Sequence, residues 1–338
     1  MKQAVIRRPH ELEVVEAAPP EARSGELLVR SVTVGICGSD LHALEGRHPF
    51  ISLPVVPGHE AAGVVEAVGA GVDGFQPGDR VLLEPNLVCG TCFYCSSGRY
   101  NLCERLAVVG CQTAGALAEL FVAPATRFHP VPAGMSMMEA ALVEPLSTGT
   151  HAARIAGDLR GAAVVVLGGG SIGLLTMLAA RADGAAIVLV TDPIQGKRRR
   201  ALDLGAEEAL DPNTPDAVAT IRGALPHRPD VVFDCVATQQ SMDQAIALAE
   251  KGGTVVVVGV PGRPVQVPLP IIQDREIRIQ GSAMYVRDDV RRAAELISQG
   301  VVEADRIVTA SFPLVEIADA FAAARSGENV KVHIQVSW

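Results

Sequence analysis

The spacing of apolar residues divides the chain into two parts with different predicted architectures. From about Ala162 onward, short β-branched runs alternate with helical patterns. The runs that predict strands are Val164–Leu167, Ile187–Thr191, Val231–Asp234, Thr254–Val258 and Ile277–Gln280. Because the intervening segments have the length of crossover helices, this part is predicted to be a doubly wound, Rossmann-type parallel sheet of the α/β class.

The first ~145 residues are predicted to be mostly β-structure with many Gly/Pro turns. Apolar and polar residues alternate in Leu28–Val32, and the segments AAGVVEAVG and FQPGDRVLL repeat the strand-and-turn signature. This pattern favours a small barrel-like domain. A helix is expected over Met137–Ala153, interrupted by Pro145.

The tail after Tyr285 follows neither pattern. It predicts a helix, a strand, a second helix and a last strand, over Val290–Gln299, Ile307–Thr309, Val315–Ala324 and Lys331–Val336. Since these elements continue neither the crossover rhythm nor a linker, we expect the tail to return to the first domain.

A glycine motif follows the first strand of the predicted parallel sheet. In LGGGSIG, Gly168, Gly170 and Gly173 form G-x-G-x-x-G, and Asp192 ends the next predicted strand. The glycines permit a tight turn, backbone approach to a pyrophosphate and close packing of helix on strand, while the acid accepts from ribose hydroxyls. Residues predicted to bind the dinucleotide are therefore Gly168, Gly170, Ser171, Ile172, Gly173 and Asp192.

Length and charge narrow the function classes. A chain of 338 residues exceeds the usual single core, so two domains are expected. The net charge of −9 argues against a nucleic-acid partner. The apolar runs are too short to cross a bilayer, and the N-terminal residues lack an apolar signal core. A cytoplasmic location and a small-molecule substrate are therefore expected.

Four of the seven cysteines crowd into one short run. Cys89, Cys92, Cys95 and Cys103 have the spacing C-x2-C-x2-C-x7-C, which matches a closed tetrahedral zinc site. Gly90 and Gly98 allow the chain to turn around the ion. Iron–sulfur ligation and free thiols are the alternatives. The leftover Cys111 and Cys235 are interpreted as small buried apolar residues.

A second set of possible metal ligands is spread along the chain. Cys37 follows a predicted strand, His59 and Glu60 lie about twenty residues on, and Glu144 stands near the junction of the two parts. One thiolate, one imidazole and a carboxylate suit zinc with an open position, as a catalytic site requires. Taken singly, each residue could equally be a core cysteine, a turn histidine or a solvated glutamate.

Together these motifs resemble the zinc-dependent medium-chain dehydrogenases, in their polyol (sorbitol) and threonine dehydrogenase branch. The resemblance runs essentially end to end and rests on CGSDLH, PGHEAAGVV, GDRV, the four-cysteine run, EPLSTGTHA, LGGGSIG and SFPL. It implies a GroES-like catalytic domain over residues 1–148 completed by 288–338, a Rossmann domain over 149–287, and an active cleft between them.

The resemblance also implies the chemistry, which is reversible oxidation of an alcohol to a carbonyl with NAD and two zinc ions. Cys37, His59, Glu60 and Glu144 surround the catalytic zinc, one glutamate acting directly and the other through water. Ser39 takes the hydroxyl proton and His42 passes it on, while Asp40 is read as a turn residue. Lys197 and Val260 are implied to contact the cofactor.

Some alternatives stay open at this stage. They are a threonine dehydrogenase-like activity and a non-catalytic NAD- and zinc-binding protein. The sequence speaks against the zinc-free quinone or enone reductase branch of the same fold, which lacks the cysteine run and the pair Cys37 and His59. Asp192 favours NAD over NADP, although the basic run Lys197–Arg200 could hold a phosphate. The apolar segment Val265–Gln280 predicts a homodimer or homotetramer.

Two positions in the sequence bear on the substrate. Met284 stands beside Tyr285 where the polyol enzymes carry arginine, and Ala43 stands where the sorbitol enzyme carries an aromatic residue. Both changes predict a less polar pocket than a sorbitol site, suited to another secondary alcohol or a cyclic polyol or sugar derivative.

Overall fold

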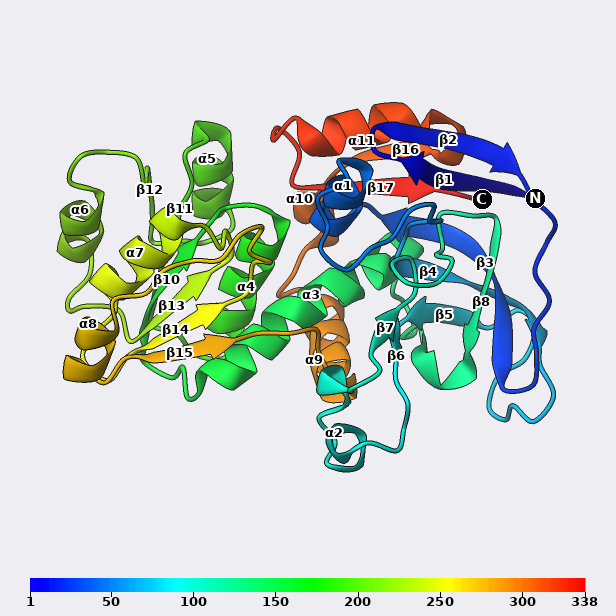
Figure 1. The fold of residues 1–338 in the computed structure, drawn as a ribbon, viewed down its shortest axis with the longest axis horizontal. Helices are drawn as coiled ribbons and strands as arrows, with labels where there is room; N and C mark the ends of the chain where they lie inside the picture. The colour runs from blue at the N-terminus through cyan, green and yellow to red at the C-terminus, as the bar shows by residue number, and fades with distance from the viewer. Residues whose placement is uncertain (338) are drawn as a thin grey trace. The chain divides into compact units, whose positions relative to one another are not determined.

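The computed structural model describes residues 1–337 and divides the chain into two compact units (Figure 1). One unit contains Met1–Glu144 together with the chain from Val286 onward, and the other contains Pro145–Tyr285. These boundaries lie a few residues before those expected from the sequence. None of the helices in the described part of the chain is long and apolar enough to cross a membrane.

The unit Pro145–Tyr285 is built on a parallel sheet with the strand order β12-β11-β10-β13-β14-β15. The strands are β10 (Ala163–Leu167), β11 (Ile187–Thr191), β12 (Glu208–Leu210), β13 (Val231–Asp234), β14 (Thr254–Val257) and β15 (Arg278–Gly281). This order reverses direction between β10 and β13, as in dinucleotide-binding folds, and confirms the predicted fold class.

Helices cover both faces of this sheet because right-handed crossovers leave β10 in opposite directions. They are α4 (Ser171–Ala182), α5 (Gln195–Asp203), α6 (Ala217–Gly223), α7 (Gln239–Leu248) and α8 (Leu269–Asp274). Figure 1 shows α4 and α7 on opposite sides of the strands. Apolar residues of α6 and α7 pack on Val165, Val232 and Val255 to form the core of one face.

The turn between β10 and α4 depends on its glycines. Gly168 has a φ of 99°, which only glycine adopts readily. At Gly173 a Cβ atom would overlap the carbonyl oxygen of Gly168, so a side chain there would push the helix off the strand. The close packing of α4 on β10 therefore requires glycine at position 173, as the motif predicts.

The other unit is a mixed, mostly antiparallel sheet in the order β16-β17-β3-β4-β5-β9, with β8 paired to β3. Its strands are β3 (Glu26–Gly35), β4 (Glu60–Val68), β5 (Arg80–Leu83), β8 (Leu120–Pro124), β9 (Phe128–Pro130), β16 (Val308–Pro313) and β17 (Lys331–Gln335). The hairpin of β1 (Lys2–Arg8) and β2 (Glu11–Glu16) and the pair β6 (Asn86–Leu87) and β7 (Ala107–Val108) complete the β-structure.

The tail contributes β16 and β17 to this sheet, and β17 pairs antiparallel with β3. The helical elements of this unit are α1 (Gly38–Leu44), α2 (Phe93–Ser96), α9 (Arg287–Ser298), α10 (Ala304–Ile307) and α11 (Ile317–Arg325), with 3-10 turns η1 (Tyr100–Leu102), η2 (Ala125–Arg127) and η3 (Leu314–Glu316). Leu314, Ile317 and Phe321 pack in the same core cluster as Val34 and Phe121.

Several element predictions were wrong in detail. Helix α3 (Met137–Ala156) runs through Pro145 without interruption, because buried Leu142, Val143 and Leu146 hold it on both sides of the proline. The apolar segment Val265–Gln280, for which only the strand at its end was predicted, also contains helix α8 before β15. Strand β12 was missed, because its Glu-Ala-Leu sequence has no β-branched residue.

Candidate functional site

Three of the predicted ligands gather at the ends of paired strands. Cys37 lies just after β3 and His59 just before β4, while Glu60 is the first residue of β4. The strand pairing sets Gly35 opposite Glu60, which brings these residues together. Their ligand atoms, one from each of Cys37, His59 and Glu60, all lie within 4.8 Å of one another. We refer to these three residues as the Cys37 cluster.

Asp40 has a larger role than the turn residue expected from the sequence. It is fully buried on α1, and its Oδ2 atom accepts a hydrogen bond from the Cys37 backbone N–H at 2.9 Å. Its Oδ1 atom lies 3.7 Å from His59 Nδ1, and neither of these two atoms has a hydrogen-bond partner among the described residues. A carboxylate facing Nδ1 orients the ring so that Nε2 is directed at a ligand or metal.

Electrostatics agree with this arrangement. Burial raises the pKa of the Asp40 carboxyl, and the charge of His59 offsets only part of that effect. Burial alone would lower the pKa of His59, but Asp40 and then Cys37 raise it well above its ordinary value. The hydroxyl of Ser39, also on α1, lies 3.4 Å from His59 Nε2. Ser39 therefore lies beside the cluster, on the Nε2 side of His59.

Glu60 forms a buried ion pair that sequence reasoning missed. Lys331 Nζ, on β17, donates to Glu60 Oε1 at 2.6 Å, to Oε2 at 2.8 Å and to the Ile36 carbonyl at 3.2 Å. Both side chains are essentially inaccessible. A Cβ atom at Gly35 would overlap Glu60 Oε2, so the carboxylate packs directly on the β3 backbone. The available signal was a lysine inside the predicted apolar strand Lys331–Val336.

The remaining predicted residues occupy different positions around this cluster. Glu144, on α3, is buried. Among the described residues, its carboxylate is not one of the groups whose ligand atoms all lie within 4.8 Å of one another in the Cys37 cluster. Its charge nevertheless acts on Lys331, raising the pKa of that lysine. His42 is half-buried on α1. Cys111, interpreted as a small apolar residue, has its thiol in hydrogen-bonding reach of His59.

The four-cysteine run folds into a lobe that brings its sulfur atoms together. The Sγ atom of Cys95 lies 3.5 Å from that of Cys92 and 3.9 Å from that of Cys89, and Cys103 belongs to the same group. A tetrahedral ion with zinc–sulfur bonds of about 2.3 Å places sulfur atoms about 3.8 Å apart. Gly90 and Gly98 have φ values of 73° and 76°, as expected for the turns around such an ion.

Backbone donors prepare these thiols for a cation. The N–H groups of Cys92 and Arg105 donate to the Sγ atoms of Cys89 and Cys103, each at 3.3 Å. Hydrogen bonds from the Thr91 and Cys92 backbone lower the pKa of Cys89 to about 5, whereas burial and neighbouring thiols raise the pKa of Cys95 to about 12. A bound dication would favour the ionised form of all four thiols.

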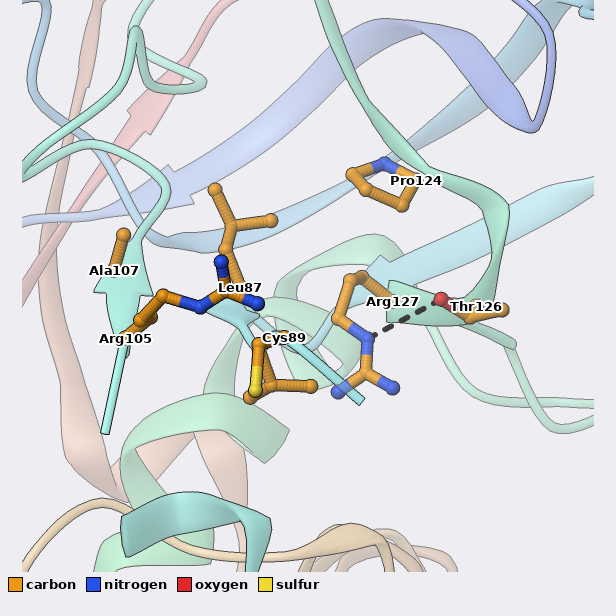
Figure 2. Close-up of a pocket in the computed structure, with 8 residues that line it drawn as sticks. Leu87, Cys89, Arg105, Ala107, Pro124, Thr126 and Arg127 are labelled. Carbon is orange, nitrogen blue, oxygen red and sulfur yellow. Dashed lines mark hydrogen bonds between the residues drawn. The ribbon is translucent and has the colours of Figure 1, made fainter. Parts of the chain in front are cut away.

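A cavity of about 370 Å³ lies beside this lobe (Figure 2). Cys89, Arg105 and Arg127 line it, along with Leu87, Val88, Ala107, Pro124 and Thr126. The guanidinium groups of Arg105 and Arg127 both reach the cavity, as Figure 2 shows. None of its lining residues belongs to the Cys37 cluster, so this cavity is separate from that cluster.

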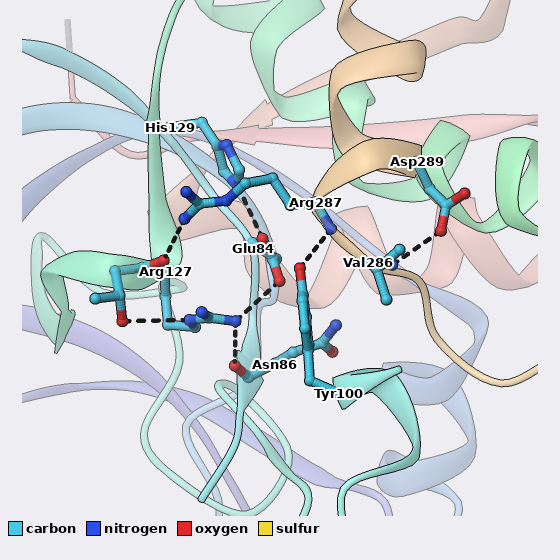
Figure 3. Close-up of polar contacts among 9 residues, drawn as sticks. Glu84, Asn86, Tyr100, Arg127, His129, Val286, Arg287 and Asp289 are labelled. Atoms are coloured by element: carbon cyan, nitrogen blue, oxygen red, sulfur yellow. Dashed lines mark hydrogen bonds and ion pairs between the residues drawn. The ribbon is translucent and has the colours of Figure 1, made fainter. Parts of the chain in front are cut away.

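A polar network fastens the lobe to the sheet (Figure 3). Fully buried Glu84, directly after β5, accepts hydrogen bonds from Arg127 at 2.9 Å and His129 at 2.8 Å. The Arg127 guanidinium also lies 5.2 Å from the ring centroid of Tyr100, whose hydroxyl accepts from the Arg287 backbone N–H. The network joins the lobe to the sheet and to the start of α9. These contacts hold the segment that carries the four thiols in place.

The other unit presents the elements of a dinucleotide site. Gly170 caps α4 without a side-chain hydrogen bond, so the first N–H groups of this helix remain available to an anion. A Cβ atom at Gly170 would meet nothing within 4 Å, which shows open space over the turn. Ser171 and Ile172 begin α4 and are half-buried, and Val260, beyond β14, is exposed.

Asp192 follows β11 at the same edge of the sheet. Its Oδ2 atom accepts from the Gly169 N–H at 2.9 Å and its Oδ1 atom from the Ile194 N–H at 2.8 Å. In the neighbouring basic run Lys197–Arg200, Arg198 stabilises the turn after β11. Its guanidinium group donates hydrogen bonds to the backbone carbonyls of Asp192 and Pro193 at 2.7 and 2.9 Å. The Lys197 Cβ atom lies near the glycine turn, 3.5 Å from a Cβ built at Gly169.

Comparisons with known proteins match both units. Residues 23–133 match the alcohol dehydrogenase GroES-like domain, and residues 171–299 match the zinc-binding dehydrogenase family. Sorbitol dehydrogenase of Ovis aries is 35% identical over 98% of this chain and 95% of its own length.

Solved structures agree. A protein described as a zinc-binding dehydrogenase from Sinorhizobium meliloti 1021, bound to NADP, has a TM-score of 0.92 and 35% identity, covering 99% of each chain. The 2R,3R-butanediol dehydrogenase of Bacillus subtilis has a TM-score of 0.91 and 28% identity, covering 99% of each chain. The chain therefore belongs to the zinc-binding dehydrogenase family with an alcohol dehydrogenase GroES-like domain.

Proposed function

We propose that this protein is an NAD-dependent zinc dehydrogenase that oxidises a secondary alcohol, polyol or sugar derivative to the ketone. The observation that carries this proposal is the Cys37 cluster, in which a thiol, an imidazole and a carboxylate converge. The family relationship to sorbitol dehydrogenase supports the reaction class.

The donor set fits zinc at both places. Sulfur and nitrogen ligands with one carboxylate suit a catalytic ion with an open position, and four thiolates suit a closed structural ion. We propose that Cys37 and His59, with Glu60 or Glu144, hold the first ion and that Cys89, Cys92, Cys95 and Cys103 hold the second. When bound, the catalytic ion supplies Lewis acidity that lowers the pKa of a substrate hydroxyl.

The protein's own residues then handle the proton. Asp40 keeps His59 in one orientation, as its Oδ1 atom faces Nδ1 at 3.7 Å. Ser39 lies 3.4 Å from His59 Nε2 and is placed to accept the proton of the substrate hydroxyl. His42 lies one helical turn from Ser39 on α1 and is proposed to pass this proton to solvent. NAD supplies the hydride acceptor.

The metal proposal predicts two zinc ions per chain. Chelation is expected to remove the ion of the Cys37 cluster first, with loss of activity, because its coordination by protein is incomplete. Cys37→Ala should lose one equivalent of zinc and all turnover, whereas Cys92→Ala should lower the unfolding midpoint, because the closed site stabilises the fold. Metal analysis and thermal unfolding measure these effects.

Cys235→Ala is the matched control for these variants, since this cysteine lies near Thr176 in the other unit, outside both groups of ligands. It should keep both ions. A single ion or none in fully loaded wild-type protein would contradict the proposal.

The arrangement around Asp192 favours NAD over NADP. Its carboxylate would repel a 2′-phosphate, while its oxygens can still accept from ribose hydroxyls. Arg198 is already engaged by the Asp192 and Pro193 carbonyls, so it is less available to hold a phosphate than the sequence suggests. Because a structural neighbour with 35% sequence identity is bound to NADP, the preference of this protein has to be measured with both cofactors.

We expect kcat/KM for NAD to exceed that for NADP by roughly tenfold or more, a difference of about 1.4 kcal/mol. Asp192→Ala should remove most of this preference, whereas Asp203→Ala, at the far end of α5, should leave it unchanged. Steady-state kinetics with both cofactors check the prediction. A lower KM for NADP with comparable kcat would show that Lys197, Arg199 and Arg200 dominate.

The substrate proposal now depends on Met284. Ala43, the other position noted in the sequence, is 2% exposed and packs with Ile6 and Val55, so its methyl group serves the core. Met284 has a φ of 50°, a conformation that non-glycine residues seldom adopt, and it precedes the buried Tyr285. A methionine there offers no hydrogen bond to a polyol hydroxyl, whereas arginine offers two.

We therefore expect sorbitol to be a poorer substrate than 2,3-butanediol or a cyclic polyol such as an inositol. Each lost hydrogen bond costs on the order of 1–3 kcal/mol, so the difference in kcat/KM should be about tenfold or more. Met284→Arg should raise kcat/KM for sorbitol selectively, with Met284→Leu as the control. If sorbitol ranks first by about tenfold for the wild-type enzyme, the argument from Met284 is wrong.

We also propose that the protein is a homo-oligomer, a dimer or a tetramer, joined through β15. This strand is at the edge of the parallel sheet, and the apolar side chains of Leu269, Ile271 and Ile279 are exposed on or next to it. An open edge with exposed apolar residues is a surface that a second copy can cover.

Sedimentation at micromolar concentration should give at least twice the mass of one chain. Ile279→Lys should shift the equilibrium toward the monomer, because a charge at an edge strand opposes pairing. Val315→Lys places the same charge at an exposed apolar position of the other unit and should not. A monomer alone for the wild-type protein would refute the proposal.

A further inference from the structure

The ion pair between Lys331 and Glu60 is an unusual feature of the metal-binding region. Lys331 is 1% exposed and Glu60 is fully buried, so both charges have been taken out of water. Burying a lone charge is costly, and only a close partner of opposite sign offsets that cost. The presence of two buried charges at this position therefore calls for an explanation in terms of the metal-binding region.

Lys331 faces negative charge from several directions. Its Nζ atom donates to both oxygens of Glu60 and to the Ile36 carbonyl. The two distances from Nζ to the Glu60 oxygens, 2.6 and 2.8 Å, are those of charge-assisted hydrogen bonds between an ammonium group and a carboxylate. Glu60 is one of the residues proposed to surround the catalytic ion.

Other nearby bases do not replace Lys331. His333, two residues along β17, is also buried, but neither of its ring nitrogens has a hydrogen-bond partner among the described residues. His59 is matched with its own partner, Asp40, at 3.7 Å. Lys331 is thus the cation that directly bonds Glu60 in the described structure.

We propose that Lys331 is a positioning residue and an internal counter-cation, which holds the Glu60 carboxylate in place and balances its charge when no metal is bound. This inference rests on the proposed catalytic zinc site. It implies that the GroES-like unit keeps a folded, metal-ready site without its ion, at the cost of weaker metal binding, since Lys331 and the dication repel each other.

A purely structural ion pair would behave differently. Removing such a lysine would destabilise the metal-free and the zinc-loaded protein by the same amount. If Lys331 instead substitutes for the charge of the ion, its loss harms the metal-free form most, because bound zinc then compensates Glu60. The difference between the unfolding midpoints of the two forms separates these roles.

The experiment compares wild-type protein with Lys331→Met, Lys331→Arg, Glu60→Gln and the double variant Lys331→Met/Glu60→Gln. Each is studied zinc-loaded and after chelation that leaves one equivalent of zinc, the ion of the four-cysteine lobe. Thermal unfolding gives the midpoint of each form, and competition with a chelator gives the zinc affinity.

We expect Lys331→Met to widen the gap between loaded and stripped midpoints by about 5 °C or more and to bind zinc at least about tenfold more tightly. Lys331→Arg should keep the wild-type gap, because it keeps the charge. The double variant should recover the stripped midpoint, since no lone charge is left buried.

An unchanged gap in Lys331→Met would overturn the inference while leaving the proposed zinc site intact. Absence of the second zinc equivalent in wild-type protein would instead remove the proposed function. If Lys331→Met folds only with zinc, the inference is supported. If it folds in neither form, the double variant decides, because folding of its stripped form supports the charge role and failure to fold shows that Lys331 acts through packing.

Discussion

The pairing of β17 with β3 is the interaction on which the GroES-like unit depends. It joins the end of the chain to a strand formed near its beginning, with His333 opposite Gly35 and Gln335 opposite Thr33. Pairing strands so far apart in sequence has a large loop-closure cost, which the buried apolar residues of β3 and β17 must offset. Because of this pairing, Lys331 meets Glu60 where β4 begins.

The same strands bring the candidate ligands together. The register of β3 and β4 aligns Gly35 with Glu60, so Cys37 and His59 extend from adjacent strand ends. Gly35 leaves room for the Glu60 carboxylate, and Asp40 is held by the Cys37 backbone on one side and faces His59 on the other. The strand register thus brings the residues of the site together, and the side-chain contacts then fix how they face one another.

Local patterns predicted much of this protein. The cysteine spacing and the glycine motif each act within a short segment, where sequence distance limits spatial distance, and both segments fold as that spacing requires. Errors arose where packing overrode local preference. Helix α3 continues through Pro145 because the surrounding residues are buried, and β12 forms without β-branched residues because β11 offers a partner.

The sequence by itself determined the fold class, the dinucleotide motif, the four-cysteine group and the resemblance that joined Cys37, His59 and Glu60. Only the tertiary structure decided which charges meet. Lys331 was recognisable as a lysine in an apolar strand, but nothing local could identify Glu60 as its partner, and Asp40 showed no sign of facing His59. The contact of Asp40 with His59 depends on how α1 packs beside the start of β4, and the contact of Lys331 with Glu60 depends on strand register and on chain closure over 271 residues. A buried charge is therefore explained only once the whole fold has supplied its counter-charge.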